Sequence, residues 1–309
     1  MSNPIRLGLV GFGKIARDQH LPAIARTKGI ELVAVASRNA QAEGCANYPT
    51  LEAMLEGDPS LDAIVLCQPP QARYEAARMA LLAGKHVFLE KPPGATLSEV
   101  DALVALAKAQ GVTLYASWHS RYAAAVAPAK RSLQARTVSS VSIVWKEDVR
   151  HWHPGQDWIW EAGGFGVFDP GINALSILTE IIGERVRLIN AELETPSNRA
   201  APIAAKLALE TAHGVPISVV LDWRQTGPQT WDIIAETDQG ALVLSHGGNQ
   251  LTIAGAQQDV PPEAEYTEMY QHFVALVASA QSDVDVAPLQ IVADAFLRGH
   301  NSTTAPFDD

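Results

Sequence analysis

Two short motifs in the first hundred residues combine residue types that could do chemistry. Lys91 follows the apolar run Val87-Phe88-Leu89, and the motif Gly11-Phe12-Gly13-Lys14-Ile15-Ala16 follows an earlier apolar run. Apolar runs of this length indicate buried strands. Ligands of an α/β sheet bind outside the carboxyl ends of its strands, so we expect both motifs to face one crevice. An amine beside a nicotinamide bound at such a turn indicates hydride transfer, with Lys91 in the path of the proton.

The glycine motif matches G-x-G-x-x-G/A, a pattern that binds dinucleotides. Gly11 permits a tight turn, Gly13 lets a phosphate approach the backbone, and Ala16 keeps the helix close to the sheet. A helix start also offers unpaired N–H groups and a partial positive charge. We therefore expect Gly11, Gly13, Lys14 and Ile15 to contact the cofactor. The alternative is an ordinary strand–helix turn that contains glycines by chance.

The end of the second predicted strand bears on the choice of cofactor. Ser37 and Arg38 stand where NAD-specific proteins usually carry an acidic residue for the ribose diol. A charge-assisted hydrogen bond contributes about 1.5–3 kcal/mol, so Arg38 against a 2′-phosphate would favour NADP roughly ten- to hundredfold. The sequence thus predicts NADP as the preferred cofactor, with NAD also used. Alternatively, Arg38 is a solvated loop residue.

Strand and helix patterns divide the chain into two predicted domains. The first predicted strands cover residues 5–10, 32–36, 63–67, 86–89 and 112–117. Helices alternate with them, the first over residues 14–26, which predicts an α/β Rossmann domain with a parallel, doubly wound sheet over residues 1–121.

The pattern changes after Arg121. Strand patterns follow at residues 138–146, 187–194, 203–210, 215–223, 229–236, 241–244 and 251–253. Several are joined by short turns, which favours antiparallel pairing. Predicted helices cover residues 122–134, 171–182, 263–279 and 288–300. Residues 122–309 are therefore expected to form an α+β domain with an open, mostly antiparallel sheet.

Composition argues against several classes of function. The formal net charge of −11 over 309 residues does not suit a nucleic-acid partner. No apolar stretch approaches the roughly 20 residues of a membrane span, and the N-terminus lacks the pattern of a signal peptide. Cys45 and Cys67 have neither metal spacing nor a disulfide framework. We expect a soluble, cytoplasmic protein that binds neither nucleic acid nor membranes.

Longer segments of the chain resemble the glucose–fructose oxidoreductase/inositol dehydrogenase (Gfo/Idh/MocA) family. Besides Glu90-Lys91-Pro92, the segments that carry the resemblance are Gly13-Lys14-Ile15-Ala16-Arg17-Asp18-Gln19-His20, Trp145-Lys146-Glu147-Asp148-Val149-Arg150, Trp152-His153-Pro154-Gly155-Gln156 and Gly166-Val167-Phe168-Asp169-Pro170-Gly171-Ile172-Asn173. The resemblance covers the whole chain. Within the family it is greatest to bacterial aldose 1-dehydrogenases that act on D-galactose and L-arabinose, and Trp118-His119-Ser120-Arg121 favours the L-arabinose branch.

The resemblance implies an enzymatic activity, and it leaves one alternative function open. The activity is NAD(P)-dependent oxidation of the C1 hydroxyl of an aldopyranose to the aldonolactone. The alternative is a regulatory protein of the same fold that binds a dinucleotide and a sugar, since fold alone does not determine function. L-arabinose and D-galactose differ by one hydroxymethyl group on the pyranose ring, so the sequence leaves the preference between them open. A homodimer that pairs through the open sheet is also expected.

The resemblance further implies roles near the reacting hydroxyl. Lys91 would bond the hydroxyl, with Glu90 beside it at the cofactor. The family commonly has an aspartate followed four residues later by a histidine, but this chain has Asp169 and Asn173. An amide is a poor proton acceptor, so the base is Asp169, or Lys91 if its pKa is lowered by burial and a cationic nicotinamide. Asp169 before Pro170 would also be a good helix N-cap without any chemistry.

Aromatic and imidazole side chains could hold the sugar. Five of the seven tryptophans lie between residues 118 and 160, and indoles suit the C–H faces of sugars. On a strand, His151 and His153 would share one face, but no further ligands stand at metal spacing, so no metal is expected. Core packing of the aromatics and a solvated Glu147 are the alternatives. The expected substrate contacts are Lys91, His119, Glu147, Trp152, His153, Asp169, Asn173 and Trp231.

Overall fold

The computed structural model describes residues 3–308, which form two compact units. The first unit runs up to His119 and adds Ala264–Val286, whereas the second holds Ser120–Glu263 and the chain from Ala287 onward. None of the helices in the described residues is long and apolar enough to cross a membrane.

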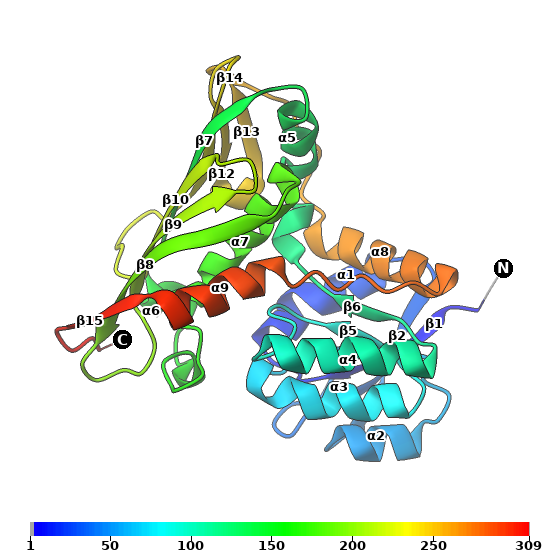
Figure 1. The fold of residues 1–309 in the computed structure, drawn as a ribbon. Coiled ribbons are helices and arrows are strands. Elements are labelled where there is room, and N and C mark those ends of the chain that lie inside the picture. Colours follow the sequence, from blue (N-terminus) through cyan, green and yellow to red (C-terminus); the bar gives the residue numbers. More distant parts are fainter. Residues whose placement is uncertain (1–2, 309) are drawn as a thin grey trace. The chain divides into compact units, whose positions relative to one another are not determined.

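Buried apolar strands build the first unit. Within residues 3–308, this unit contains a six-stranded parallel sheet in the order β3-β2-β1-β4-β5-β6. Helices cover both of its faces, with α2, α3 and α4 on one side and α1 and α8 on the other (Figure 1), as expected for a buried parallel sheet. The doubly wound α/β fold is therefore confirmed. The strands are β1 Ile5–Val10, β2 Ile30–Ala36, β3 Ala46–Tyr48, β4 Ala63–Leu66, β5 His86–Leu89 and β6 Leu114–Ala116, and the helices are α1 Leu21–Arg26, α2 Leu51–Gly57, α3 Arg73–Leu82, α4 Leu97–Gln110 and α8 Glu265–Ser279.

The segment around α8 corrects the predicted domain boundary, which placed it in the second domain of residues 122–309. The ring of Phe88 on β5 stacks on Tyr270 with centroids 5.0 Å apart, and Phe273 meets it edge-on at 5.5 Å. Beyond α8, the backbone of Asp283 bonds to both Leu114 and Ala116 of β6. The apolar face of α8 thus completes the core of the first unit, although it follows the second sheet in sequence.

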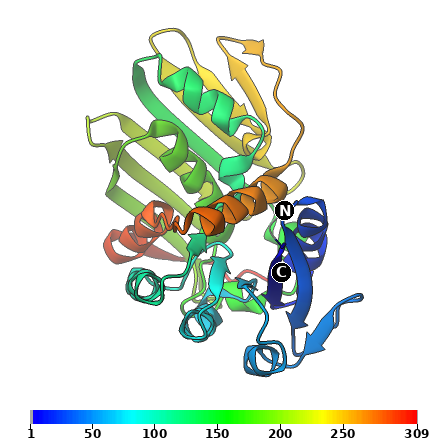
Figure 2. The same ribbon diagram turned by 90° about the vertical axis from the view of Figure 1, so that its right-hand side faces the viewer.

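The second unit contains, among the described residues, a nine-stranded sheet in the order β14-β13-β12-β11-β7-β10-β9-β8-β15. Most neighbours are antiparallel as predicted, but β10 pairs with β7, and β15 with β8, in parallel. Helices α5, α7 and α9 lie on one face, and the other is left open (Figures 1 and 2). The strands are β7 Val138–Lys146, β8 Val186–Pro196, β9 Ala204–Thr211, β10 Pro216–Asp222, β11 Thr230–Thr237, β12 Leu242–Ser245, β13 Gln250–Ile253, β14 Ala256–Gln257 and β15 His300–Thr304, and the helices are α5 Val126–Leu133, α6 Val149–Trp152, α7 Phe168–Ile182 and α9 Ala287–Arg298.

Two predicted helices differ in the structure. The segment 14–26 is a π-helical turn, Ala16–His20, followed by α1. The last helix ends at Arg298 instead of continuing to His300, and His300 opens β15 beside β8. Edge pairing of this kind depends on a distant strand, so the local pattern does not reveal it.

A buried ion pair fastens the end of β5. The Glu90 carboxylate accepts hydrogen bonds from His20 Nε2 at 3.2 Å, from the Tyr266 hydroxyl at 3.1 Å and from the Lys91 N–H at 2.6 Å. The Tyr270 hydroxyl lies 2.7 Å from His20 Nδ1. The side chain of His20 is fully buried, and that of Glu90 is 6% exposed. Every polar atom of the pair is thus satisfied, as a buried charge requires.

The pair shifts the pKa of both members. Burial by itself lowers the pKa of His20, but Cys67 and Glu90 outweigh burial and raise that pKa to about 10. Burial raises the pKa of Glu90, but the bond and charge of His20 outweigh it and hold that pKa at about 2. The charge on His20 therefore adds stability below its ordinary pKa of 6.5, and this is lost as the pH rises toward 10. The charge on Glu90 adds stability above 4.5, which is lost as the pH falls toward 2.

Replacing Glu90 with Gln tests this pair. At pH 6 the substitution should lower the free energy of unfolding by about 3–5 kcal/mol, because it leaves the His20 cation buried without its counter-charge. The loss should shrink as the pH approaches 10, where His20 becomes neutral. Denaturant unfolding at both pH values measures the difference. An equal loss at both would show that the pair is not ionic.

Candidate active site

The turn after β1 has the geometry that dinucleotide binding needs. Gly11 has a φ of +91°, and a Cβ there would lie only 3.0 Å from the backbone nitrogen of Gln68. A Cβ on Gly13 would meet nothing within 4 Å, so the backbone at Gly13 borders open space. Ala16 is fully buried. The three small residues therefore play the parts predicted for them: a tight turn, an accessible backbone and close packing.

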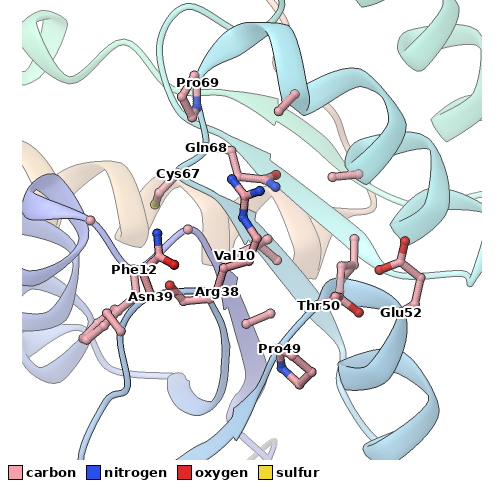
Figure 3. A pocket seen from close by; sticks show the side chains of 18 of the residues that line it. Val10, Phe12, Arg38, Asn39, Pro49, Thr50, Glu52, Cys67, Gln68 and Pro69 are labelled. Atoms are coloured by element: carbon pink, nitrogen blue, oxygen red, sulfur yellow. The ribbon is translucent and has the colours of Figure 1, made fainter. Parts of the chain in front are cut away.

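A pocket of about 700 Å³ opens beside this turn (Figure 3). Its walls come from the segments that follow β1, β2 and β4, together with the first residues of α2 and part of α3. The carboxyl ends of β1 and β4 meet where the strand order reverses, which is where open α/β sheets bind ligands. Gly11, Gly13, Ser37 and Arg38 line this pocket, as predicted for cofactor-binding residues. The residues present thus fit a dinucleotide.

Other predicted cofactor contacts lie outside the lining of this pocket. Lys14 forms an exposed ion pair with Asp18, and Ile15 is 40% exposed. Both carboxylate oxygens of Glu90 accept hydrogen bonds from protein partners, and one of these donors is the N–H of Lys91.

Two acidic side chains that sequence reasoning missed share the pocket with Arg38. Glu52, in the first turn of α2, and Glu75, in the first turn of α3, both line its walls. Arg38 is exposed and forms no ion pair with any residue in the range 3–308. Its guanidinium can therefore meet an anion, but two carboxylates contribute negative charge to the same pocket.

Lys91 is fixed by the backbone that surrounds it. Its N–H donates to Glu90 Oε2, and the peptide bond to Pro92 is cis. The buried guanidinium of Arg73 donates to the carbonyls of Glu90, Pro92 and Gln68. Arg73 therefore joins the ends of β4 and β5. No sequence pattern indicates this role of Arg73, because the residue lies at the start of an ordinary helix.

His119 also belongs to the first unit. Its Nδ1 lies 2.8 Å from Glu265 Oε2, and its ring stacks on Tyr266 with centroids 5.3 Å apart. Because Nδ1 contacts Glu265 and one face of the ring lies on Tyr266, a sugar would contact His119 through Nε2 or the opposite ring face.

A buried carboxylate organises the second unit's cluster. Glu147, directly after β7, is 2% exposed, which rules out the solvated strand-end charge. Its Oε1 accepts from Trp223 Nε1 at 3.3 Å and lies 3.2 Å from His153 Nε2, and its Oε2 accepts from Trp231 Nε1 at 2.8 Å. Trp152, 40% exposed, lies against Trp231 with ring centroids 5.0 Å apart. Glu147 thus serves to hold its neighbours in place.

Trp223 is a member of this cluster that the sequence did not single out. It is fully buried and follows β10, the strand that pairs in parallel with β7. The N–H of Glu147 donates to the carbonyl of Asp222 at 3.0 Å, which places Glu147 beside Trp223. The unpredicted parallel pairing therefore brings the indole to the carboxylate.

The segment around His153 is helical, so the expectation of a strand with His151 and His153 on one face was wrong. The Asp148 side chain accepts from the N–H of Arg150 at 3.0 Å and begins α6, a single helical turn. His153 follows that turn, with Nε2 toward Glu147 and Nδ1 3.7 Å from Asp169 Oδ2. Among the residues described, no group of three or more His, Cys, Asp or Glu side chains could hold a metal.

Asp169 lies inside the first turn of α7, two residues further in than the predicted N-cap position, and is 6% exposed. Val167 takes the N-cap position without a side-chain cap. The N–H groups of Phe168 and Asp169 donate to the carbonyls of Phe165 and Gly166, and Pro170 has no N–H that needs an acceptor. Asn173 follows one turn later on the same side of the helix. A Cβ on Gly171 would lie 2.5 Å from Leu221 Cδ1, so glycine lets α7 approach β10 closely.

The structure thus gathers Glu147, Trp152, His153, Asp169 and Trp231 in the second unit, with Asn173 a turn away. Lys91 and His119 lie in the first unit. The second-unit cluster combines two buried carboxylates, an imidazole and indole surfaces, which suits a polyhydroxylated ligand from which a proton must be removed.

Known proteins resemble this chain along its whole length. Residues 5–117 match the oxidoreductase family with an NAD-binding Rossmann fold. Galactose 1-dehydrogenase from Pseudomonas fluorescens is 44% identical over 306 residues, 99% of either protein. The crystal structure of D-galactose-1-dehydrogenase from Rhizobium etli has 57% identity and a TM-score of 0.96, covering 100% of this chain and 99% of its own.

A more distant structure shares the fold alone. It is a 3-ketoreductase from Actinomadura kijaniata in complex with NADP, with a TM-score of 0.85 at 20% identity, covering 98% of this chain and 100% of that one. Three observations agree on the family of this chain. They are the full-length identity well above 30%, the dinucleotide turn and the Glu90-Lys91-Pro92 motif. This chain belongs to the Gfo/Idh/MocA family of NAD-binding Rossmann-fold oxidoreductases.

Proposed function

We propose that this oxidoreductase is an NAD(P)-dependent aldose 1-dehydrogenase that converts an aldopyranose to its aldonolactone. The observation that carries the proposal is the cluster around Asp169, in which two carboxylates, His153 and indole rings come together, so that it combines groups that can accept a proton with surfaces that suit a sugar. The names of the two full-length relatives, both galactose 1-dehydrogenases, support it.

D-galactose and L-arabinose are the substrates that we propose. Their pyranose rings differ by the hydroxymethyl group on C5, and a pocket discriminates one such group by only about 1–3 kcal/mol. Trp152 offers exposed indole surface next to Trp231, which suits the C–H face of either ring. We therefore expect activity on both sugars, with Trp118-His119-Ser120-Arg121 favouring L-arabinose.

In this function the first unit binds the cofactor. The backbone of Gly11 and Gly13 would hold the pyrophosphate, and Ser37 and Arg38 would reach the 2′-phosphate of NADP. The bound oxidised nicotinamide supplies the acceptor for the hydride from C1. Lys91 would donate a hydrogen bond to O1 and stabilise the negative charge that develops there.

The second unit would bind the sugar and take its proton. Asp169 is the proposed acceptor of the O1 proton, and the Asn173 amide would orient a neighbouring hydroxyl. Glu147 already bonds two indole N–H groups and an imidazole, so its main role is to hold Trp231 and His153 in place.

We also propose that a second copy of the chain covers the open face of the nine-stranded sheet. Val144 and Val220 are neighbours on that face, as are Ser142 and Ile234, and all four are half-buried. Small hydroxyls between branched apolar side chains suit close packing of two sheets.

Ile234→Lys should convert the proposed dimer into a monomer, because each interface would bury an unpaired ammonium. Glu268→Lys, on the exposed surface of α8, is the control and should remain dimeric. Light scattering on the purified variants measures the mass. A monomeric wild-type chain would rule out this pairing.

The activity itself is tested by mixing the protein with either cofactor and a panel of aldoses, and following absorbance of the reduced nicotinamide. Lys91→Ala should lower turnover roughly 10²–10⁴-fold, the usual effect of removing an acid–base group, while the cofactor still binds. A protein that binds sugar and dinucleotide without reducing the cofactor would be a regulator instead.

Arg38 governs the expected preference for NADP. Arg38→Ala should raise the Michaelis constant for NADP roughly ten- to hundredfold, because a charge-assisted bond to the 2′-phosphate is lost, and should change that for NAD little. Glu52→Gln is the matched control on another wall of the pocket, and it should lower the constant for NADP by removing negative charge. Steady-state kinetics with both cofactors decide this. Equal effects of Arg38→Ala on both would show that Arg38 does not contact the phosphate.

A further inference from the structure

One ring nitrogen of His153 lacks a hydrogen bond although it is buried. Among residues 3–308, Nδ1 of this histidine has no hydrogen-bond partner, and the nearest carboxylate oxygen, Asp169 Oδ2, lies 3.7 Å away. Most buried polar atoms in native proteins are bonded, so an exception needs a physical reason. The side chain is 15% exposed, and it lies between Glu147 on one side and Asp169 on the other.

The hydrogen bond to Glu147 determines which ring nitrogen of neutral His153 carries the proton. Its carboxylate is buried, accepts from both Trp223 and Trp231, and can only accept hydrogen bonds when ionised. His153 must therefore direct an N–H from Nε2 to Glu147 Oε1, 3.2 Å away. A neutral ring then presents the Nδ1 lone pair toward Asp169.

The contact between Nδ1 and Asp169 thus joins two proton acceptors. No proton lies between them when the imidazole is neutral and Asp169 is ionised. A single added proton would turn the contact into a charge-assisted hydrogen bond, which is shorter and stronger than a neutral one. Asp169 and Glu147 are the titratable groups that face the ring, from α7 and from the end of β7, and the uncharged ring of Trp223 lies 5.2 Å from it.

We propose that His153 is the proton acceptor behind Asp169 and that Glu147 is the positioning residue that fixes its tautomer. The inference rests on the function proposed above. The C1–H bond breaks and its electron pair passes with the hydrogen to the oxidised nicotinamide, while a C1=O double bond forms. The O1 proton passes to Asp169 and then to Nδ1, and the imidazolium later releases it to water.

The alternative is that His153 only binds a sugar hydroxyl. A binding role would raise the Michaelis constant of the sugar and leave kcat and its pH dependence unchanged, whereas a proton acceptor acts on kcat. The two roles therefore differ in which constant changes, and the kinetics of variants separate them.

The central variant is His153→Ala, with His151→Ala as the control on an exposed neighbour. His153→Ala should lower kcat roughly 100-fold and flatten the fall of kcat at low pH, and added imidazole should restore much of the rate. His151→Ala should retain wild-type kcat. An unchanged kcat in His153→Ala, with only a higher Michaelis constant and no response to imidazole, would overturn the proposal.

Two further variants keep the test decisive. If His153→Ala fails to fold, His153→Gln can still donate to Glu147 but cannot store a proton, so it should show the same loss of kcat at a normal melting temperature. Asp169→Asn should lose at least as much, and the double variant with His153→Ala no more than the worse single one, because both act in one path. Independent, additive losses would contradict a shared path. A wild-type enzyme inactive on every sugar would overturn the proposed function and this inference together.

Discussion

Burial of a carboxylate at the end of a strand is the constraint on which both units depend. An ion removed from water costs several kcal/mol unless its lone pairs are filled, so each such carboxylate dictates the placement of its donors. Glu90 requires His20 and Tyr266, which come from the first helical segment and from α8. Glu147 requires the indoles of Trp223 and Trp231, which come from the ends of two strands beside β7. In each unit the carboxylate therefore gathers elements that are distant in sequence.

Each buried carboxylate also fixes the position of a functional residue that follows it in the chain. Lys91 comes directly after Glu90 and donates its N–H to it, and His153 is held by Glu147 through Nε2. A functional group must be held within a fraction of an ångström of its working geometry, which packing against a buried, fully bonded neighbour provides.

Sequence patterns predicted what is local and missed what depends on distant contacts. The apolar runs of β1, β4 and β5 and the glycine turn were readable because burial and backbone conformation select their residues directly. The three-residue strand β3 is too short and too exposed to leave a pattern, and the membership of α8 depends on Phe88 offering it an apolar surface. In the site, Trp223 and Arg73 have the burial or spacing of ordinary core and helix residues, so only the fold shows that they hold functional groups.

In the proposed chemistry, the two units supply different kinds of hydrogen-bonding groups. The first-unit groups to which we assign contacts with phosphate or O1 are mainly donors: backbone N–H groups at the glycine turn, the Arg38 guanidinium and the Lys91 ammonium. Those of the second unit are mainly acceptors, with Asp169 and the Nδ1 lone pair of His153 adjacent to each other. Oxidation of an alcohol produces anionic character on oxygen and releases a proton. It therefore needs hydrogen-bond donors to stabilise the oxygen and an acceptor to take the proton. In the path proposed above, the imidazole beside Asp169 comes from His153 in a different segment of the chain, and the amide at position 173 then needs only to orient a hydroxyl.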